Sequence, residues 1–153
     1  MLSLQRTNSQ HPDFQQLVAS LDQDLKIRDG DEHAFFAQFN KIDKLNHVIL
    51  AYIDTIPVGC GAFKKYEEGI IEIKRMYVLP ENRGQGIASY VLSELEKWGA
   101  ELNYQKCVLE TGLKQPEAIQ LYKKNNYTRI PNYGPYVEVD NSVCFEKLLL
   151  SHI

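Results

Sequence analysis

A glycine-rich turn between a predicted strand and a predicted helix constrains this chain more than any other feature. Residues 70–79 are predicted to form a strand, and apolar residues recur at helical spacing over 87–102. Between them, residues 83–88 read Arg-Gly-Gln-Gly-Ile-Ala. Glycines let the backbone approach a ligand, and the unpaired amides at a helix start favour an anion. The turn therefore predicts a phosphate or pyrophosphate site with Arg83 as a fixed positive charge; a tight turn with no ligand is the alternative.

Two better-known phosphate-binding turns do not fit this segment. A P-loop requires Gly-Lys-Ser/Thr after its spacer, whereas Gly86 is followed here by Ile87 and Ala88. A dinucleotide-binding turn requires a third Gly or Ala where Ser89 stands, and it follows the opening strand of a βαβ unit rather than a meander. The turn therefore belongs to neither class.

The rest of the pattern predicts one domain of the α+β, or mixed α/β, class over residues 1–153. Its predicted elements follow in this order: an edge strand over 2–6, a helix opening at Pro12, a short helix over 32–40, a meander of strands over 47–53, 58–65 and 70–79, the long helix over 87–102, a strand over 107–111, a helix opening at Gln115, a short strand over 127–130 and a closing strand over 143–149.

Composition narrows the class of protein. The 153 residues are 44% hydrophobic and 24% charged, with a formal net charge of −3, which favours a folded domain over a disordered chain. The slightly acidic balance argues against nucleic acid, and no apolar run is long enough for a membrane span. With no signal-peptide pattern at the start, we expect a cytoplasmic protein. The three cysteines form no ligand pattern, so we expect buried thiols and no metal site: Cys60, Cys107 and Cys144.

The sequence resembles the GNAT superfamily of acetyl-CoA-dependent N-acetyltransferases. The stretch 83–88 matches the family signature R/Q-x-x-G-x-G/A, and residues 109–127 resemble its later block N-x-x-A-x-x-L-Y … G-F/Y. Gln115 stands where Asn is usual, and Asn126 stands where Gly is usual. The resemblance implies a central, mostly antiparallel twisted sheet of about six to seven strands, flanked by about four helices.

The resemblance also implies a site for acetyl-CoA as co-substrate. The family holds the pyrophosphate at the start of the helix that follows the glycine-rich turn. It polarises the thioester carbonyl with a backbone amide where its central strand bulges. Carried onto this sequence, the cofactor-binding residues are Met76, Tyr77, Val78, Arg83, Gly84, Gln85, Gly86, Ile87, Ala88 and Gln115.

Proton transfer requires an acid and a base. Tyr122 stands at the position of the family's general-acid tyrosine, and a phenol is protonated at neutral pH. A core aromatic on an amphipathic helix is the alternative. Glu72 stands at the spacing of the glutamate base of histone-acetylating members. Glu110 and an ordered water chain are the alternatives for the base. The alternative for Glu72 is a solvated carboxylate paired with a lysine such as Lys74 or Lys64.

The expected function is transfer of an acetyl group from acetyl-CoA to a primary amine of a small molecule or peptide, by direct attack in a ternary complex. A non-catalytic acyl-CoA-binding or sensor domain is the alternative. A homodimer through the closing strand or a sheet face is compatible with the pattern. Two groups of residues are candidates to meet the amine. One is the aromatic loop 132–136, for which a plain turn is the alternative. The other is a group of acidic residues, for which a solvated face is the alternative: Asp22, Asp24, Asp29, Asp31 and Glu32.

Overall fold

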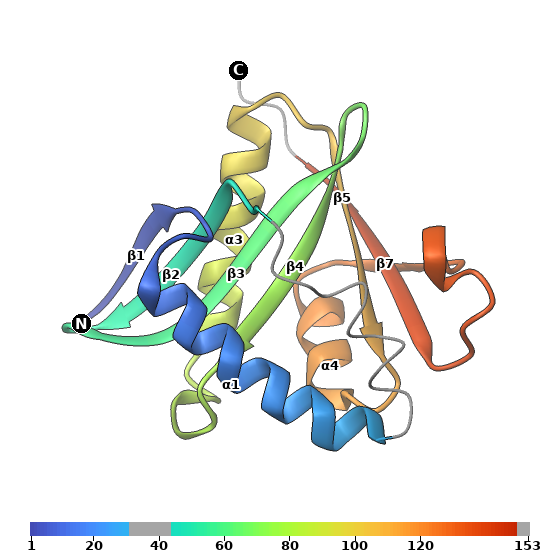
Figure 1. Cartoon of the computed structure of the whole chain (residues 1–153). Coiled ribbons are helices and arrows are strands. Elements are labelled where there is room, and N and C mark those ends of the chain that lie inside the picture. The colour runs from blue at the N-terminus through green and yellow to red at the C-terminus, as the bar shows by residue number, and fades with distance from the viewer. Residues whose placement is uncertain (31–43, 150–153) are drawn as a thin grey trace. The chain divides into compact units, whose positions relative to one another are not determined.

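Seven strands form one mixed, mostly antiparallel sheet in the computed structural model (Figure 1). Its strand order is β1-β2-β3-β4-β5-β7-β6. The strands are β1 (Leu2–Thr7), β2 (His47–Ile53), β3 (Ile56–Glu67), β4 (Ile70–Val78), β5 (Lys106–Gly112), β6 (Thr128–Ile130) and β7 (Ser142–Leu148). The structure describes residues 1–30 and 44–149, and this part of the chain contains the helices α1 (Pro12–Asp29), α3 (Ile87–Glu101) and α4 (Pro116–Lys124).

The predicted α+β class is confirmed, and each predicted strand has a counterpart. The helix predicted over 32–40 lies outside the described residues. Leu102, predicted on the inner face of the long helix, lies just beyond the end of α3 and is 44% exposed. None of the helices in the described part of the chain is long and apolar enough to cross a membrane.

The last strand lies inside the sheet. β7 pairs with β5 on one side and with β6 on the other, both antiparallel. Over Cys144–Glu146 both edges of β7 are therefore hydrogen-bonded, which leaves this stretch closed to edge-to-edge pairing with a second copy. A homodimer through another face stays a prediction.

The chain forms two compact units. Unit 1 consists of Met1–Lys64 and Lys74–Leu95, and unit 2 consists of Lys65–Ile73 and Glu96–Ile153. Both β4 and α3 contribute residues to each unit. The single domain expected over 1–153 stays a prediction.

The core of unit 1 is built on the alternation of β3. Cys60 and Ala62 point toward α1, while Gly59 and Gly61 face the apolar side of α3, because successive side chains of a strand point to opposite faces. The buried cluster on the α1 side consists of Phe14, Leu17, Val18, Leu21, Leu25, Leu45, Val48, Leu50, Cys60, Ala62 and Tyr77. All three cysteines of the chain are buried free thiols, as predicted.

Glycine is required at position 61 by close packing. A Cβ atom there would lie 2.5 Å from the Met76 Sδ and 2.9 Å from both the Leu95 Cδ1 and the Val91 Cγ1. We expect Gly61→Ala to lower the free energy of unfolding by about 1–3 kcal/mol, because these side chains must leave their rotamers. Chemical denaturation measures the change.

Gly112→Ala is the matched control for this substitution. It is also a strand glycine, but the nearest atom to its added Cβ is 3.6 Å away, at ordinary contact distance. We expect less than about 0.5 kcal/mol of change there. Equal losses in both variants would show that close packing is not the reason for Gly61.

Unit 2 has a polar network beside its aromatic core. The Tyr127 hydroxyl donates to the Glu96 Oε2 at 2.9 Å, and the Lys147 Nζ donates to the Glu96 Oε1 at 2.8 Å. The Tyr127 ring packs edge-on to Tyr122, with ring centroids 5.7 Å apart, and Tyr122 also contacts Phe145. Each oxygen of the Glu96 carboxylate therefore has a donor, as a half-buried charge requires.

Candidate active site

The glycine-rich turn of unit 1 is exposed and left-handed at two positions. Gly84 and Gly86 both have φ of +80°, a conformation that glycine adopts without strain. Among residues 1–30 and 44–149, no atom lies within 4 Å of a Cβ placed at Gly84, so this part of the chain leaves the backbone there open to a ligand. Ile87 is the buried anchor of the turn. The Tyr90 amide donates to the Gly86 carbonyl at 3.1 Å, which closes the first turn of α3.

The start of α3 can therefore hold an anion. The first amides of a helix have no intrahelical acceptor, and the aligned peptide dipoles add positive charge there. Open glycine backbone immediately before such a helix is the arrangement that phosphate groups occupy in nucleotide-binding proteins. A phosphate or pyrophosphate site at this turn stays a prediction.

Arg83 ties this turn to the end of β4. Its Nε donates to the Val78 carbonyl at 2.9 Å, and its guanidinium lies 5.5 Å from the centroid of the Tyr77 ring. An Asp24 oxygen lies 3.9 Å from Arg83 Nη2. The sequence predicted a positive charge beside the turn, but it did not predict the hydrogen bond from Arg83 to the Val78 carbonyl.

β4 contains a left-handed arginine directly before the segment Met76–Val78. Arg75 has φ of +60°, and its carbonyl accepts a weak hydrogen bond from the Cys60 thiol at 3.4 Å. The parallel pairing of β4 with β5 covers Ile70–Glu72, upstream of this residue. A bulge near 76–78 is expected from the family resemblance and stays a prediction; the backbone departs from extended geometry at the preceding residue, Arg75.

The side chain of Arg75 is buried and paired. Its Nη1 lies 2.7 Å from the Asp22 Oδ1, and the side chains of Arg75 and Asp22 are 4% and 47% exposed. Asp22 therefore neutralises a buried cation rather than lining a free acidic surface. Asp24 is likewise engaged, 3.3 Å from the Arg28 Nε. The side chain of Asp29, and Asp31 and Glu32, lie outside what the structure describes.

Glu72 is buried in unit 2, with 5% of its surface exposed. Its Oε2 accepts a hydrogen bond of 2.6 Å from the Tyr133 hydroxyl. The alternative of a solvated strand carboxylate is therefore wrong, since water is largely excluded from this side chain. Glu110, the second candidate base, accepts a 2.7 Å hydrogen bond from the Ser142 hydroxyl and is less buried.

Tyr122 is 6% exposed and lies on the inner side of α4. Burial, followed by the charge of Glu110, raises the pKa of the Tyr122 phenol, so the group is protonated at neutral pH. Within residues 1–30 and 44–149 its hydroxyl has no hydrogen-bond partner, although buried hydroxyls nearly always have one. A proton donor is thus buried without an acceptor from the described protein.

The two departures from the family pattern lie at the ends of α4. Gln115 is the N-cap residue of α4 and makes no side-chain capping bond, which an Asn would favour. Asn126 has φ of +72°, a conformation in which Asn is the best tolerated residue after Gly. The Asn at 126 therefore preserves the backbone that a glycine would adopt.

Within each unit, the structure brings some of the predicted residues together. In unit 1, Tyr77 and Val78 contact Arg83 beside the glycine-rich turn. In unit 2, Glu72 contacts Tyr133, which the sequence analysis placed only in an aromatic loop. Arg75 was missed altogether, since an arginine inside a strand pattern carries no signal of left-handed backbone. Among the described residues, no group of three or more His, Cys, Asp or Glu is arranged to hold a metal ion.

Comparisons with known proteins agree with this description. Residues 10–127 match the acetyltransferase (GNAT) family. The "IAA acetyltransferase" of Azospirillum brasilense is 37% identical over 93 residues, which cover 60% of this chain and 61% of that protein. A Klebsiella pneumoniae structure assigned as an acyl-CoA N-acyltransferase has 28% identity and a TM-score of 0.81, over 98% of this chain and 99% of that one.

A third similar protein is the PaiA N-acetyltransferase of Thermoplasma acidophilum, solved in complex with coenzyme A. It has 16% identity and a TM-score of 0.70 over 97% of this chain and 99% of that one, a likeness of fold alone. The matched segment spans less than two thirds of the Azospirillum protein. Because the family match covers well over half of the sequence, the chain belongs to the GNAT acetyltransferase family.

Proposed function

We propose that this protein transfers an acetyl group from acetyl-CoA to a primary amine of a small molecule or peptide, by direct attack in a ternary complex. The observation that carries the proposal is the open, left-handed Gly84–Gly86 backbone at the start of α3, in a chain of the GNAT family. The similar Thermoplasma acidophilum protein binds coenzyme A, which supports the same ligand here.

The residues of unit 1 fit the cofactor. Acetyl-CoA supplies an acetyl group activated as a thioester, and its pyrophosphate carries the charge that the helix start favours. The amides of residues 84–88 would hold that pyrophosphate, with Arg83 keeping the turn joined to β4. Backbone groups of Met76–Val78 would pair with the pantetheine arm as an added strand does and donate to the carbonyl oxygen as charge develops on it. Gln115 is proposed as a further cofactor contact.

Two side chains of unit 2 are proposed to move the protons. The amine loses one proton, its nitrogen bonds to the carbonyl carbon, the carbon–sulfur bond breaks, and the sulfur gains one proton. Tyr122 is the donor to sulfur, supported by its burial and by its hydroxyl, which has no partner within the described part of the chain. Glu72 is the acceptor of the amine proton, directly or through water, supported by its burial.

Gly84→Ala tests the binding turn. A methyl group there requires strained left-handed backbone and stands where the anion would bind, so we expect KM for acetyl-CoA to rise about tenfold with kcat changed less than about twofold. Gly30→Ala is the matched control, because Gly30 also has positive φ and an added Cβ there would meet no described atom within 4 Å. Both variants lose about 1 kcal/mol of stability. A KM that moves equally in both would remove the turn from the site.

The first experiment on the function is a thermal melt with acetyl-CoA, CoA, ATP and NAD in parallel. A ligand at about 100 times its Kd stabilises the native state by roughly 2.7 kcal/mol, and for a domain of this size that raises Tm by roughly 5–10 °C. A rise with acetyl-CoA and CoA alone supports the proposal and leads to an amine screen by thiol release. A flat response from folded protein overturns it. Binding without transfer to any amine would favour a non-catalytic acyl-CoA sensor.

A further inference from the structure

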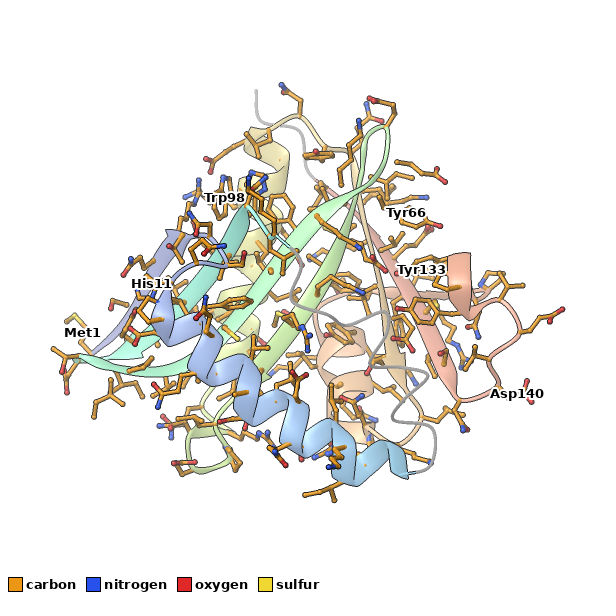
Figure 2. All side chains as sticks on the ribbon, in the orientation of Figure 1. Met1, His11, Tyr66, Trp98, Tyr133 and Asp140 are labelled. Carbon is orange, nitrogen blue, oxygen red and sulfur yellow. The ribbon has the colours of Figure 1, made fainter. Side chains whose placement is uncertain are left out.

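Glu72 is held by a residue from a distant loop. The Tyr133 hydroxyl donates to the Glu72 Oε2 at 2.6 Å, and the two residues are 61 positions apart in the chain. This length is typical of a hydrogen bond from a hydroxyl to an ionised carboxylate, which is about twice as strong as a neutral one. Figure 2 shows the Tyr133 side chain beside the side chain of Tyr66, which lies on β3.

Tyr133 is itself fixed from three sides. Its ring meets the ring of Tyr66 edge-on at 5.1 Å and 71°, and the ring of Tyr136 at 5.9 Å and 86°. Its carbonyl accepts a 3.0 Å hydrogen bond from the Tyr136 amide, which closes a short 3₁₀ turn over Gly134–Tyr136. Tyr136 is almost completely buried, so the turn is anchored in the core. The phenol of Tyr133 is therefore presented to Glu72 in one orientation.

We propose that Tyr133 is a positioning residue for the transfer reaction, holding the Glu72 carboxylate ionised and oriented to accept the proton of the amine. The inference rests on the proposed function, in which Glu72 is the base. A base must be ionised before it can accept a proton, and a hydrogen bond donated to a carboxylate favours its ionised form. The bond also fixes the plane of the carboxyl group, and supporting contacts of this kind keep a reacting group in productive geometry.

The tyrosine and cysteine side chains of this cluster are protonated where the base must act, while Glu67 and Arg129 are charged groups near Tyr66 and Cys144. Burial is the main cause that raises the pKa of Tyr66, Tyr133 and Tyr136, and it raises the pKa of Cys144 to about 11. These groups keep their protons below about pH 9. The other carboxyl group of this cluster is Glu110, which accepts its hydrogen bond from Ser142.

The test is the pH dependence of kcat/KM for the amine in Tyr133→Phe, which keeps both ring contacts and loses only the hydroxyl. With one amine used throughout, we expect kcat/KM to fall roughly tenfold on the acid limb of the profile. The acid limb of the profile moves to higher pH by about one unit, and the loss shrinks above the limb. A uniform loss at every pH would overturn the proposal, because a merely structural role lowers the amount of folded enzyme without moving the limb.

Tyr127→Phe is the matched control. It removes a phenol that donates to a different carboxylate of unit 2, the Glu96 Oε2 at 2.9 Å, for which no catalytic role is proposed. We expect a lower Tm and an acid limb at the wild-type position. A limb that moves as far in Tyr127→Phe as in Tyr133→Phe would mean that the shift does not come from the bond to Glu72, and it would overturn the proposal.

Glu72→Gln distinguishes failure of the role proposed for Tyr133 from failure of the role proposed for Glu72. If the variant loses the acid limb while Tyr133→Phe leaves it in place, only the role of Tyr133 fails. If Glu72→Gln keeps the limb, the base is a different group, and both roles fail while acetyl transfer stands. Glu110→Gln then identifies or excludes the second carboxylate as the source of the limb.

A measurement without substrate completes the design. In protein carrying ¹³C-labelled glutamate carboxyls, the signal missing from Glu72→Gln belongs to Glu72. We expect the midpoint of its titration to rise by about one pH unit in Tyr133→Phe. An unchanged midpoint would overturn the proposal whichever amine the enzyme uses, and even if acetyl transfer were not detected.

Discussion

Tyr122→Phe is expected to lower kcat by about 100-fold or more while leaving the Kd for CoA within about twofold of wild type. The substitution removes the proposed donor to the leaving sulfur, and a positioned general acid typically contributes a factor of this size. The ring contacts with Tyr127 and Phe145 remain available to phenylalanine. Single-turnover kinetics and CoA titration together measure the two constants.

Stability distinguishes the two roles considered for Tyr122. Its buried hydroxyl has no partner within residues 1–30 and 44–149, and an unpaired buried polar group destabilises the fold. We therefore expect Tyr122→Phe to unfold at the same Tm as wild type or higher, although it is the less active enzyme. Tyr127→Phe is the reverse case, since it loses a bond to Glu96 and is expected to lose stability while keeping its activity within about twofold. A Tyr122→Phe enzyme with wild-type kcat would make Tyr122 a core aromatic only.

Local patterns predicted the parts of the fold that short segments determine. Pro12 marks the first residue of α1, and the left-handed glycines of the 83–88 turn are followed by α3 from Ile87. Each of these depends on neighbours within a few positions: a residue with fixed φ, a residue free to adopt positive φ, and apolar side chains at helical spacing. The sequence therefore predicted the local backbone of the proposed anion-binding turn nearly completely.

Contacts between distant segments could not be predicted in the same way. The position of β7 between β5 and β6 depends on which strands pair. An alternating pattern indicates which face of the sheet each side chain points to, but not which strands lie next to each other. The bond from Tyr133 to Glu72 spans 61 positions, and no local signal joins the two residues. The sequence placed Glu72 as a candidate base and Tyr133 in an aromatic loop without indicating that they meet.

The conformation of Arg75 could not be predicted from the sequence for a different reason. Residues 70–79 form an apolar strand pattern in which a single arginine suggests an exposed position, yet its side chain is buried and its backbone is left-handed. A glycine there would have signalled positive φ. What makes the arginine tolerable is Asp22, which lies 53 positions earlier on α1, so its placement depends on tertiary packing.

Asp22→Asn is expected to lower the free energy of unfolding by about 2–3 kcal/mol. The substitution keeps the size of the side chain and removes the charge that balances the buried Arg75 guanidinium. Breaking a fully buried pair costs about 3–5 kcal/mol, and the expected value is smaller because Asp22 is half-exposed and water can reach it. For a domain of this size Tm falls by roughly 5–10 °C. Because Arg75 directly precedes Met76–Val78, we also expect KM for acetyl-CoA to rise several-fold.

Glu68→Gln is the matched control for Asp22→Asn, because it makes the same change of charge in an exposed ion pair. Glu68 also pairs with a cation, Lys65, but its side chain is almost fully exposed. The same change of chemistry is therefore expected to leave the Tm and the KM unchanged. Equal effects at the two sites would mean that the Arg75 charge is solvated in solution, and the left-handed residue of β4 would then owe its conformation to the backbone alone. A large loss confined to Asp22→Asn would instead show that α1 holds β4 in the shape that precedes the proposed thioester site.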